Sequence, residues 1–145
     1  MEMRKLLLVV VMASSLFAAD IIIKNSNKTV EATVEKLENI VTKKGFTVFA
    51  VVNHQAGANK VRMKLAPAQE IIFGNPKMGT LLMQENILVG LDLPIRVLVF
   101  QDEDLKTKIA YRNGTWLGEE HNLTKKKLIN KMNFALENII TEAGR

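Results

Sequence analysis

The sequence predicts an α+β domain in which helices pack on one face of a mostly antiparallel sheet. Two stretches, residues 30–41 and 128–143, repeat apolar side chains every three or four positions, as amphipathic helices do. Short apolar runs rich in β-branched residues lie between them and are typical of strands. Short links between successive runs favour antiparallel neighbours. The 145 residues fit one domain, and 48% hydrophobic residues suffice for a core.

The N-terminus is predicted to be a secretory signal peptide at residues 1–19, followed by a single domain at residues 20–145. Two basic residues precede an uninterrupted apolar run at residues 6–12, and small residues continue to Ala19. This run is too short to span a bilayer comfortably. We expect cleavage after Ala18 or Ala19 and export to the periplasm, with an uncleaved anchor as the alternative.

Composition excludes several classes of protein. The 20 basic and 15 acidic residues leave a net charge of +5, too small an excess to indicate nucleic-acid binding. The absence of cysteine excludes a disulfide framework, thiol catalysis, iron–sulfur sites and covalently attached haem. No second apolar run is long enough to span a membrane, so no membrane insertion of the mature chain is expected.

The first half of the chain is expected to contain two strands and a helix. Residues 20–24 form a short β-branched strand, and Thr29 can cap the helix over residues 30–41. Gly45 follows this helix, where a positive φ is common. Residues 46–53 are apolar on both faces, which predicts a central strand covered on both sides or a strand at a dimer contact.

The middle of the chain is organised around a strand–helix–strand corner. Residues 55–66 are ambiguous, although a short helix is one option. Residues 70–73 form the third strand. Asn75 then provides an N-cap with Pro76 at the first helical position, and the fourth strand covers residues 95–101.

The last third of the chain should add an edge strand and a covering helix. Residues 105–111 alternate, with lysines on one face that would protect an edge. Asn113 and Gly114 read as a turn. Thr124 is expected to cap the final helix, whose stripe over residues 128–143 should cover the sheet.

Several motifs together resemble the bacterial domain-of-unknown-function 302 family. The residues that carry the resemblance are GFTVFAVVNH, Ala56, Ala58, IIFGNPKMGT, GLDLPIRVLVF, Tyr111 and His121, within residues 29–123. The resemblance implies a β-α-β4-α domain, grouped by shape with the TATA-binding-protein-like folds, and often a homodimer. It implies no established activity. The family's usual acidic-then-glycine turn is DEDLK here, so this hairpin is expected to be longer or less tight.

The corner residues offer one candidate site. Asn75, Lys77 and Thr80 surround a predicted helix start, where N–H groups and the helix dipole favour an anion. The alternative is a capped helix with a solvated lysine. No phosphate-binding loop pattern is present.

The two histidines offer a second candidate. His54 ends a predicted strand and His121 precedes the last helix, so both could lie at one rim of the sheet. They would then form a metal or ligand site, completed by Asp92, Glu119 or Glu120. Either imidazole could also act as an acid–base catalyst. The alternative is that each histidine only fixes a loop.

Asp92 and Arg96 form a third candidate, because a guanidinium within an apolar strand needs a carboxylate or solvent. A structural ion pair and a ligand clamp are both compatible with this spacing. The methionines read as core or, alternatively, as thioether ligands for Cu(I) in an exported protein; they are Met63, Met78, Met83 and Met132.

The segment EHNLT resembles an acidic N-glycosylation sequon with Asn122 as the acceptor. The alternative is that Thr124 only caps a helix.

We therefore expect a periplasmic binding or interaction domain that holds a small ligand, an anion or a metal. The alternatives are a small enzyme using His54 or His121, and a structural homodimer. The sequence does not identify a cofactor. The full set of candidate ligand-binding residues is His54, Asn75, Lys77, Thr80, Asp92, Arg96 and His121.

Overall fold

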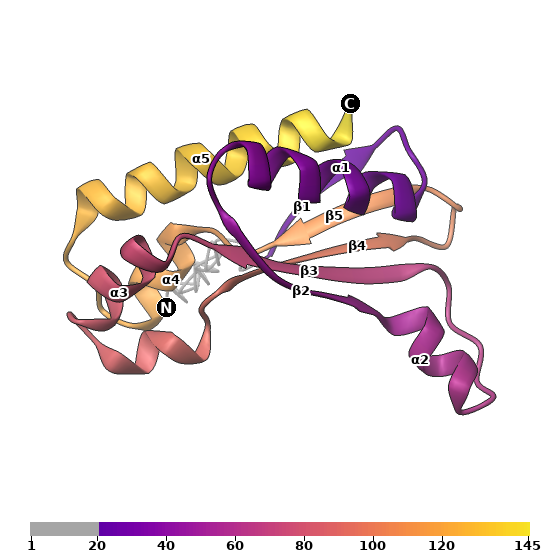
Figure 1. Ribbon diagram of the computed structural model, residues 1–145, viewed down its shortest axis with the longest axis horizontal. Coiled ribbons are helices and arrows are strands. Elements are labelled where there is room, and N and C mark those ends of the chain that lie inside the picture. The colour runs from indigo at the N-terminus through magenta and orange to yellow at the C-terminus, as the bar shows by residue number, and fades with distance from the viewer. Residues whose placement is uncertain (1–20) are drawn as a thin grey trace, which may run out of the picture.

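The computed structural model describes residues 21–145 and contains one five-stranded antiparallel sheet with two long helices on one face (Figure 1). The elements are β1 (Ile22–Ser26), α1 (Val30–Lys43), β2 (Thr47–Asn53), α2 (His54–Lys60), β3 (Ala68–Gly74), α3 (Pro76–Met83), the 3-10 helix η1 (Ile87–Leu91), β4 (Ile95–Gln101), β5 (Thr107–Tyr111), α4 (Gly114–Glu120) and α5 (Lys126–Gly144). The α+β class and the β-α-β4-α order are confirmed. The shorter helices are additions to that order.

The sheet has the strand order β1-β5-β4-β3-β2, and every neighbouring pair is antiparallel. This order corrects two predictions. Residues 46–53 were expected in a central strand or in a strand at a dimer contact. The first alternative is wrong, because β2 is an edge strand and most of its residues are exposed, and the second stays a prediction. Residues 105–111 were expected at an edge, but β5 lies between β1 and β4. The apolar composition of residues 46–53 and the lysine spacing in residues 105–111 concern the two faces of one strand. They do not determine which strands are neighbours, because pairing depends on the whole topology.

Helices α1 and α5 lie side by side over the sheet and bury its inner face (Figure 1). The inner residues of β3, β4 and β5 alternate with outward ones, as a half-buried antiparallel sheet requires. In the described part of the chain, no helix lies across the outer face (Figure 1). The remaining helices gather at the two ends: α3, η1 and α4 at one, and α2 at the other.

Helix ends follow the sequence signals in most places. The Thr29 side chain accepts a hydrogen bond from the Ala32 amide, as predicted. Gly45 adopts a φ of 80°, and the amides after α1 close a Schellman motif. Asn113 does not make the predicted turn: its side chain accepts from the Trp116 amide and starts α4. An Asn-Gly pair is compatible with both uses, since asparagine is also a strong N-cap.

Thr124 does not cap α5. Helix α5 follows Lys125, which makes no side-chain cap. The Thr124 amide and hydroxyl both donate to the Glu85 carboxylate, which lies between α3 and η1. The hydrogen bond from the Thr124 amide is the largest cause that holds the pKa of Glu85 below its usual value. The start of α5 is therefore tied to the corner, a contact between positions far apart in the sequence.

The hairpin between β4 and β5 closes without the glycine. Leu105 takes a φ of 60°, in the left-handed region, and is exposed. The Asp102 carboxylate accepts bonds from the amides of Asp104 at 3.0 Å and Lys106 at 2.8 Å. These contacts, with the Lys106 amide first, lower the pKa of Asp102. The loop compensates a strained leucine with side-chain hydrogen bonds.

Candidate functional site

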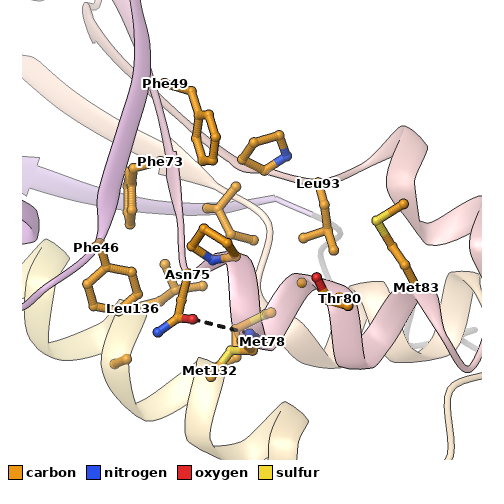
Figure 2. A pocket seen from close by; sticks show the side chains of 15 residues that line it. Phe46, Phe49, Phe73, Asn75, Met78, Thr80, Met83, Leu93, Met132 and Leu136 are labelled. Atoms are coloured by element: carbon orange, nitrogen blue, oxygen red, sulfur yellow. Dashed lines mark hydrogen bonds between the residues drawn. The ribbon is translucent and has the colours of Figure 1, made fainter.

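The strand–helix corner encloses a cavity of about 240 Å³ (Figure 2). It lies where the end of β3 and the start of α3 meet α5 and the segment before β4. Its lining is formed by Phe46, Phe49, Phe73, Asn75, Pro76, Met78, Gly79, Thr80, Met83, Leu93, Pro94, Ile95, Met132, Ala135 and Leu136. We call this cavity the apolar pocket.

Aromatic side chains form one wall of the apolar pocket. The rings of Phe46 and Phe73 meet edge to face, with centroids 5.9 Å apart and planes at 88°. Strand β2 changes register against β3 between Val48 and Ala50. Phe49 lies at this irregularity and turns toward the pocket mouth beside Phe73 (Figure 2), as bulges next to sites often re-aim a side chain. Phe49 remains 53% exposed and marks the opening to solvent.

The corner itself is built as the sequence predicted. The Asn75 side chain accepts from the Met78 amide at 3.2 Å, and Pro76 occupies the first turn of α3. Asn75 and Thr80 line the apolar pocket, whereas Lys77 does not line it. The Thr80 hydroxyl points inward beside Leu93 (Figure 2). The N-cap is therefore confirmed, while the corner presents apolar surface to the cavity.

No charged side chain lines the apolar pocket among residues 21–145. Its polar lining groups are the Asn75 amide and the Thr80 hydroxyl. Burying an unpaired charge among apolar groups costs several kcal/mol or more, so the pocket disfavours ionised ligands. The chemistry of this pocket therefore fits a neutral molecule better than the anion or metal considered from the sequence.

Three of the four candidate methionines line the apolar pocket, but they do not converge. Met78 and Met132 lie together, and Met83 lies apart from them beyond Leu93 and Thr80 (Figure 2). Met63 is 66% exposed and does not line this pocket. This separation contradicts a shared Cu(I) site. Flexible thioethers instead give the lining an adaptable shape.

The two histidines lie at opposite ends of the sheet. His54 begins α2 and is exposed, next to the β2 end that pairs with Gln69. His121 ends α4, on the side where α3 and η1 gather (Figure 1). The expectation that both share one rim is therefore wrong, and so is a metal site using both. Among the described residues no group of three or more histidine, cysteine or carboxylate side chains could hold a metal.

His121 is instead paired with Asp92. Its Nε2 lies 2.7 Å from Asp92 Oδ2, and only 10% of the imidazole is exposed. The Asn86 side chain donates to the His121 carbonyl at 3.0 Å. These contacts join the loop before β4 to the end of α4. Of the acidic partners proposed for His121, the structure brings Asp92 into contact.

Arg96 does not pair with Asp92, its nearest carboxylate in sequence. Its guanidinium lies 3.6 Å from Glu70, on the neighbouring strand β3. The reason is strand geometry: Arg96 is opposite Ile72, so Glu70 lies diagonally across on the same face. Asp92 precedes the strand and turns to His121. Asp92 and Arg96 nevertheless both line a second cavity of about 180 Å³, at the start of β4 and the end of β5.

Asn122 has a backbone role that the sequon reading did not consider. It is exposed and adopts a φ of 52° directly after α4. The amide of Leu123 donates to the Gly118 carbonyl at 2.8 Å, and that of Asn122 to the Glu119 carbonyl, which is a Schellman motif. Asparagine tolerates this conformation better than most residues.

The sequence reading missed most of the apolar lining, including Phe49, Leu93 and Leu136. These residues come from β2, the loop before β4 and α5. Their only sequence signal is hydrophobicity, which core residues share.

Comparisons with known proteins agree with this architecture. The family model "Domain of unknown function DUF302" matches residues 22–139. A crystal structure of an uncharacterized conserved protein DUF302 from Bacillus stearothermophilus superposes with a TM-score of 0.71 at 22% identity. That likeness covers 88% of this chain and 97% of the other and concerns the fold alone.

Longer proteins also contain a related segment. Proteins named "Fluoride-specific ion channel FluC 1" from Brucella suis biovar 1 and Brucella abortus biovar 1 are 36% identical over 110 residues. The match covers 76% of this chain but 43% and 41% of those proteins, so the chain spans about two fifths of their length. No helix among residues 21–145 is long and apolar enough to cross a membrane. The chain belongs to the DUF302 family of domains of unknown function.

Proposed function

We infer that this protein is a binding domain whose apolar pocket takes a small neutral molecule. The observation that carries this proposal is a cavity of about 240 Å³ lined by phenylalanine, methionine and leucine side chains and by no charged group. Concave apolar sites with few polar groups are the usual form of small-molecule sites. The predicted export to the periplasm is part of the same proposal.

The size of the pocket bounds the ligand. An apolar cavity of about 150 Å³ is known to bind benzene. The apolar pocket is larger and opens beside Phe49, so it can accept one ring with a short substituent, or a short aliphatic chain. The methionines on two walls can adjust to either shape.

The polar groups of the pocket restrict the ligand further. The Thr80 hydroxyl points into the cavity and can donate to one acceptor (Figure 2). The Asn75 carbonyl oxygen is already engaged by the Met78 amide, which leaves its NH₂ group at the rim. We therefore expect an apolar body with a single hydrogen-bonding group, such as an ether, ketone or alcohol.

A pair of matched probes tests this proposal. In isothermal titration calorimetry, the neutral molecule benzyl alcohol should bind the chain from residue 20 onward with saturation, and the charged single-ring molecule benzenesulfonate should compete for this site at least tenfold more weakly. Ala135→Leu places three further carbons in the pocket and should abolish probe binding. The control is Ala56→Leu on α2, which adds the same atoms at an exposed position.

Two results would contradict the pocket assignment. One is equal binding of the two molecules at the site that Ala135→Leu closes, since a pocket that accepts a sulfonate is not selective for neutral molecules. The other is unchanged binding in Ala135→Leu, which would place the probe elsewhere. Native mass spectra of the chain purified from the periplasm, compared with denatured spectra, would reveal a resident ligand and the mass of the N-terminus.

A second candidate function is homodimeric assembly through β2 and the outer face of the sheet. It is favoured by the exposed apolar side chains Phe49, Val51 and Val52 on an edge strand. Light scattering after size exclusion should then give twice the chain mass, and Val52→Lys should give the monomer. A monomer in the unmodified chain at high micromolar concentration would exclude this proposal.

A further inference from the structure

We propose that the cavity of about 180 Å³ at the start of β4 and the end of β5 is a second binding site, specific for a small organic acid held by Arg96 and Arg112. We call it the arginine cavity. It is distinct from the apolar pocket, which lies on the corner side of the segment from Asp92 to Arg96. Arg112 and Trp116, which help to form it, were not among the candidate residues from the sequence.

The two arginines line the same cavity at one end of the β4–β5 ladder. Val97 pairs with Tyr111 in that ladder, and Arg96 and Arg112 are the next residues beyond this pair. Ile95 and Val97 are buried, so the alternation turns Arg96 away from the inner face. Like charges brought close together across two strands repel. Both residues line the arginine cavity, where an anion between them would remove the repulsion.

Arg112 has no carboxylate partner among the described residues within ion-pair distance. Its guanidinium instead lies over the Trp116 ring, 4.7 Å from the centroid. This stacking holds the planar group in place and leaves its N–H edge available. Arginine presents a fork of donors that matches carboxylate and phosphate oxygens.

The carboxylates of the cavity are engaged by other groups. Glu70 lies 3.6 Å from Arg96, and Asp92 is hydrogen bonded to His121 at 2.7 Å. The Arg96 side chain remains 60% exposed, so its contact with Glu70 is a loose surface pair. An incoming anion competes with Glu70 for Arg96, and meets no competitor at Arg112.

The rest of the lining suits an organic acid rather than a bare ion. Apolar walls come from Ile21, Ile95, Ala110 and Leu117. The volume of the arginine cavity is slightly larger than the roughly 150 Å³ that accommodates benzene in an apolar cavity. The fitting ligand therefore has a body of about one ring and a single carboxylate or phosphate group.

Trp116 is the only tryptophan of the chain, so its emission reports directly on this cavity. Benzoate and inorganic phosphate are titrated separately at low ionic strength, with chloride as the matched salt control. We expect a saturable change with benzoate, a weaker one with phosphate, and none with chloride. Benzoate alone would show that the apolar body is necessary, whereas a response to phosphate alone would contradict the assignment of an organic acid.

Variants separate the proposed role from a structural one. Arg96→Gln keeps the Arg112–Trp116 stack and should weaken binding at least tenfold. Glu70→Gln removes the competitor and should strengthen binding several-fold. Arg62→Gln, an exposed position beyond α2, should change nothing.

The proposal is overturned if benzoate gives no saturable change, or if Arg96→Gln binds benzoate as tightly as the unmodified chain. A Glu70→Gln variant that binds more weakly would also contradict it. The test is independent of the apolar pocket, because Ala135→Leu should leave the response to benzoate and phosphate unchanged.

Discussion

The contact between Tyr111 and Glu137 makes a prediction about alkaline stability. The Tyr111 hydroxyl donates to Glu137 Oε2 at 3.1 Å, and Lys24 Nζ lies 2.9 Å from Glu137 Oε1. Tyr111 is only 4% exposed. Burial and then the charge of Glu137 raise the pKa of Tyr111 from 10.0 to about 12. The contact joins α5 to the centre of the sheet.

A folded-state pKa above the unfolded value means that the stabilisation is complete below the unfolded pKa and is lost as pH rises. For Tyr111 the loss starts near the ordinary tyrosine pKa of 10.0 and continues toward a pH of about 12. One pH unit corresponds to about 1.4 kcal/mol, so the tyrosine should lose roughly that amount by about pH 11. At neutral pH, Tyr111→Phe removes one hydrogen bond and should cost about 1 kcal/mol.

The difference in unfolding free energy between the native chain and Tyr111→Phe should therefore shrink above about pH 10 and reach zero near about pH 11. Urea unfolding of both proteins at matched pH measures this difference. Lysine titration affects both proteins equally and cancels. A difference that stays constant across this range would refute the assignment of the raised pKa to Tyr111.

Four further substitutions, one of them a control, test the backbone geometry. Leu105→Gly should stabilise the protein by about 0.5–1 kcal/mol in urea unfolding, because it relieves a φ of 60°, and a loss of stability would contradict this account. Gly144→Ala should destabilise by about 1–2 kcal/mol because its Cβ would lie 2.5 Å from the Asn25 carbonyl oxygen, whereas Gly57→Ala, with nothing within 4 Å, should be neutral or stabilising; equal effects would disprove the steric argument. Asn122→Gly should keep stability within about 0.5 kcal/mol and remove any mass attached to that side chain, as intact-protein mass spectrometry checks.

Local signals predicted the helix caps and the strand–helix corner. The roles of Thr29, Gly45 and Asn75 depend on hydrogen bonds and backbone angles within a few positions along the chain. Such local features can be predicted from the residue types alone. The residues on the inner face of β5 could be predicted for the same reason, since the alternation of side chains is a property of one strand.

Contacts between segments that are distant along the chain could not be predicted from the sequence. Asn113 and Thr124 carry side chains suited to a turn, a cap or a tertiary bond, and only the position of Glu85 selects the bond for Thr124. Arg96 had Asp92 nearby in sequence, yet strand register placed Glu70 closer. Register and neighbour order are set by the packing of the whole sheet.

The sequence by itself determined the fold class, the family resemblance and the corner that begins α3. The tertiary structure alone decided what surrounds that corner. It separated His54 from His121 by the length of the sheet, gathered apolar side chains from β2, β3, α3, β4 and α5 around one cavity, and brought Arg96 and Arg112 to another. Periodicity describes which face a residue occupies, but a binding site depends on which faces meet, and long-range packing determines that.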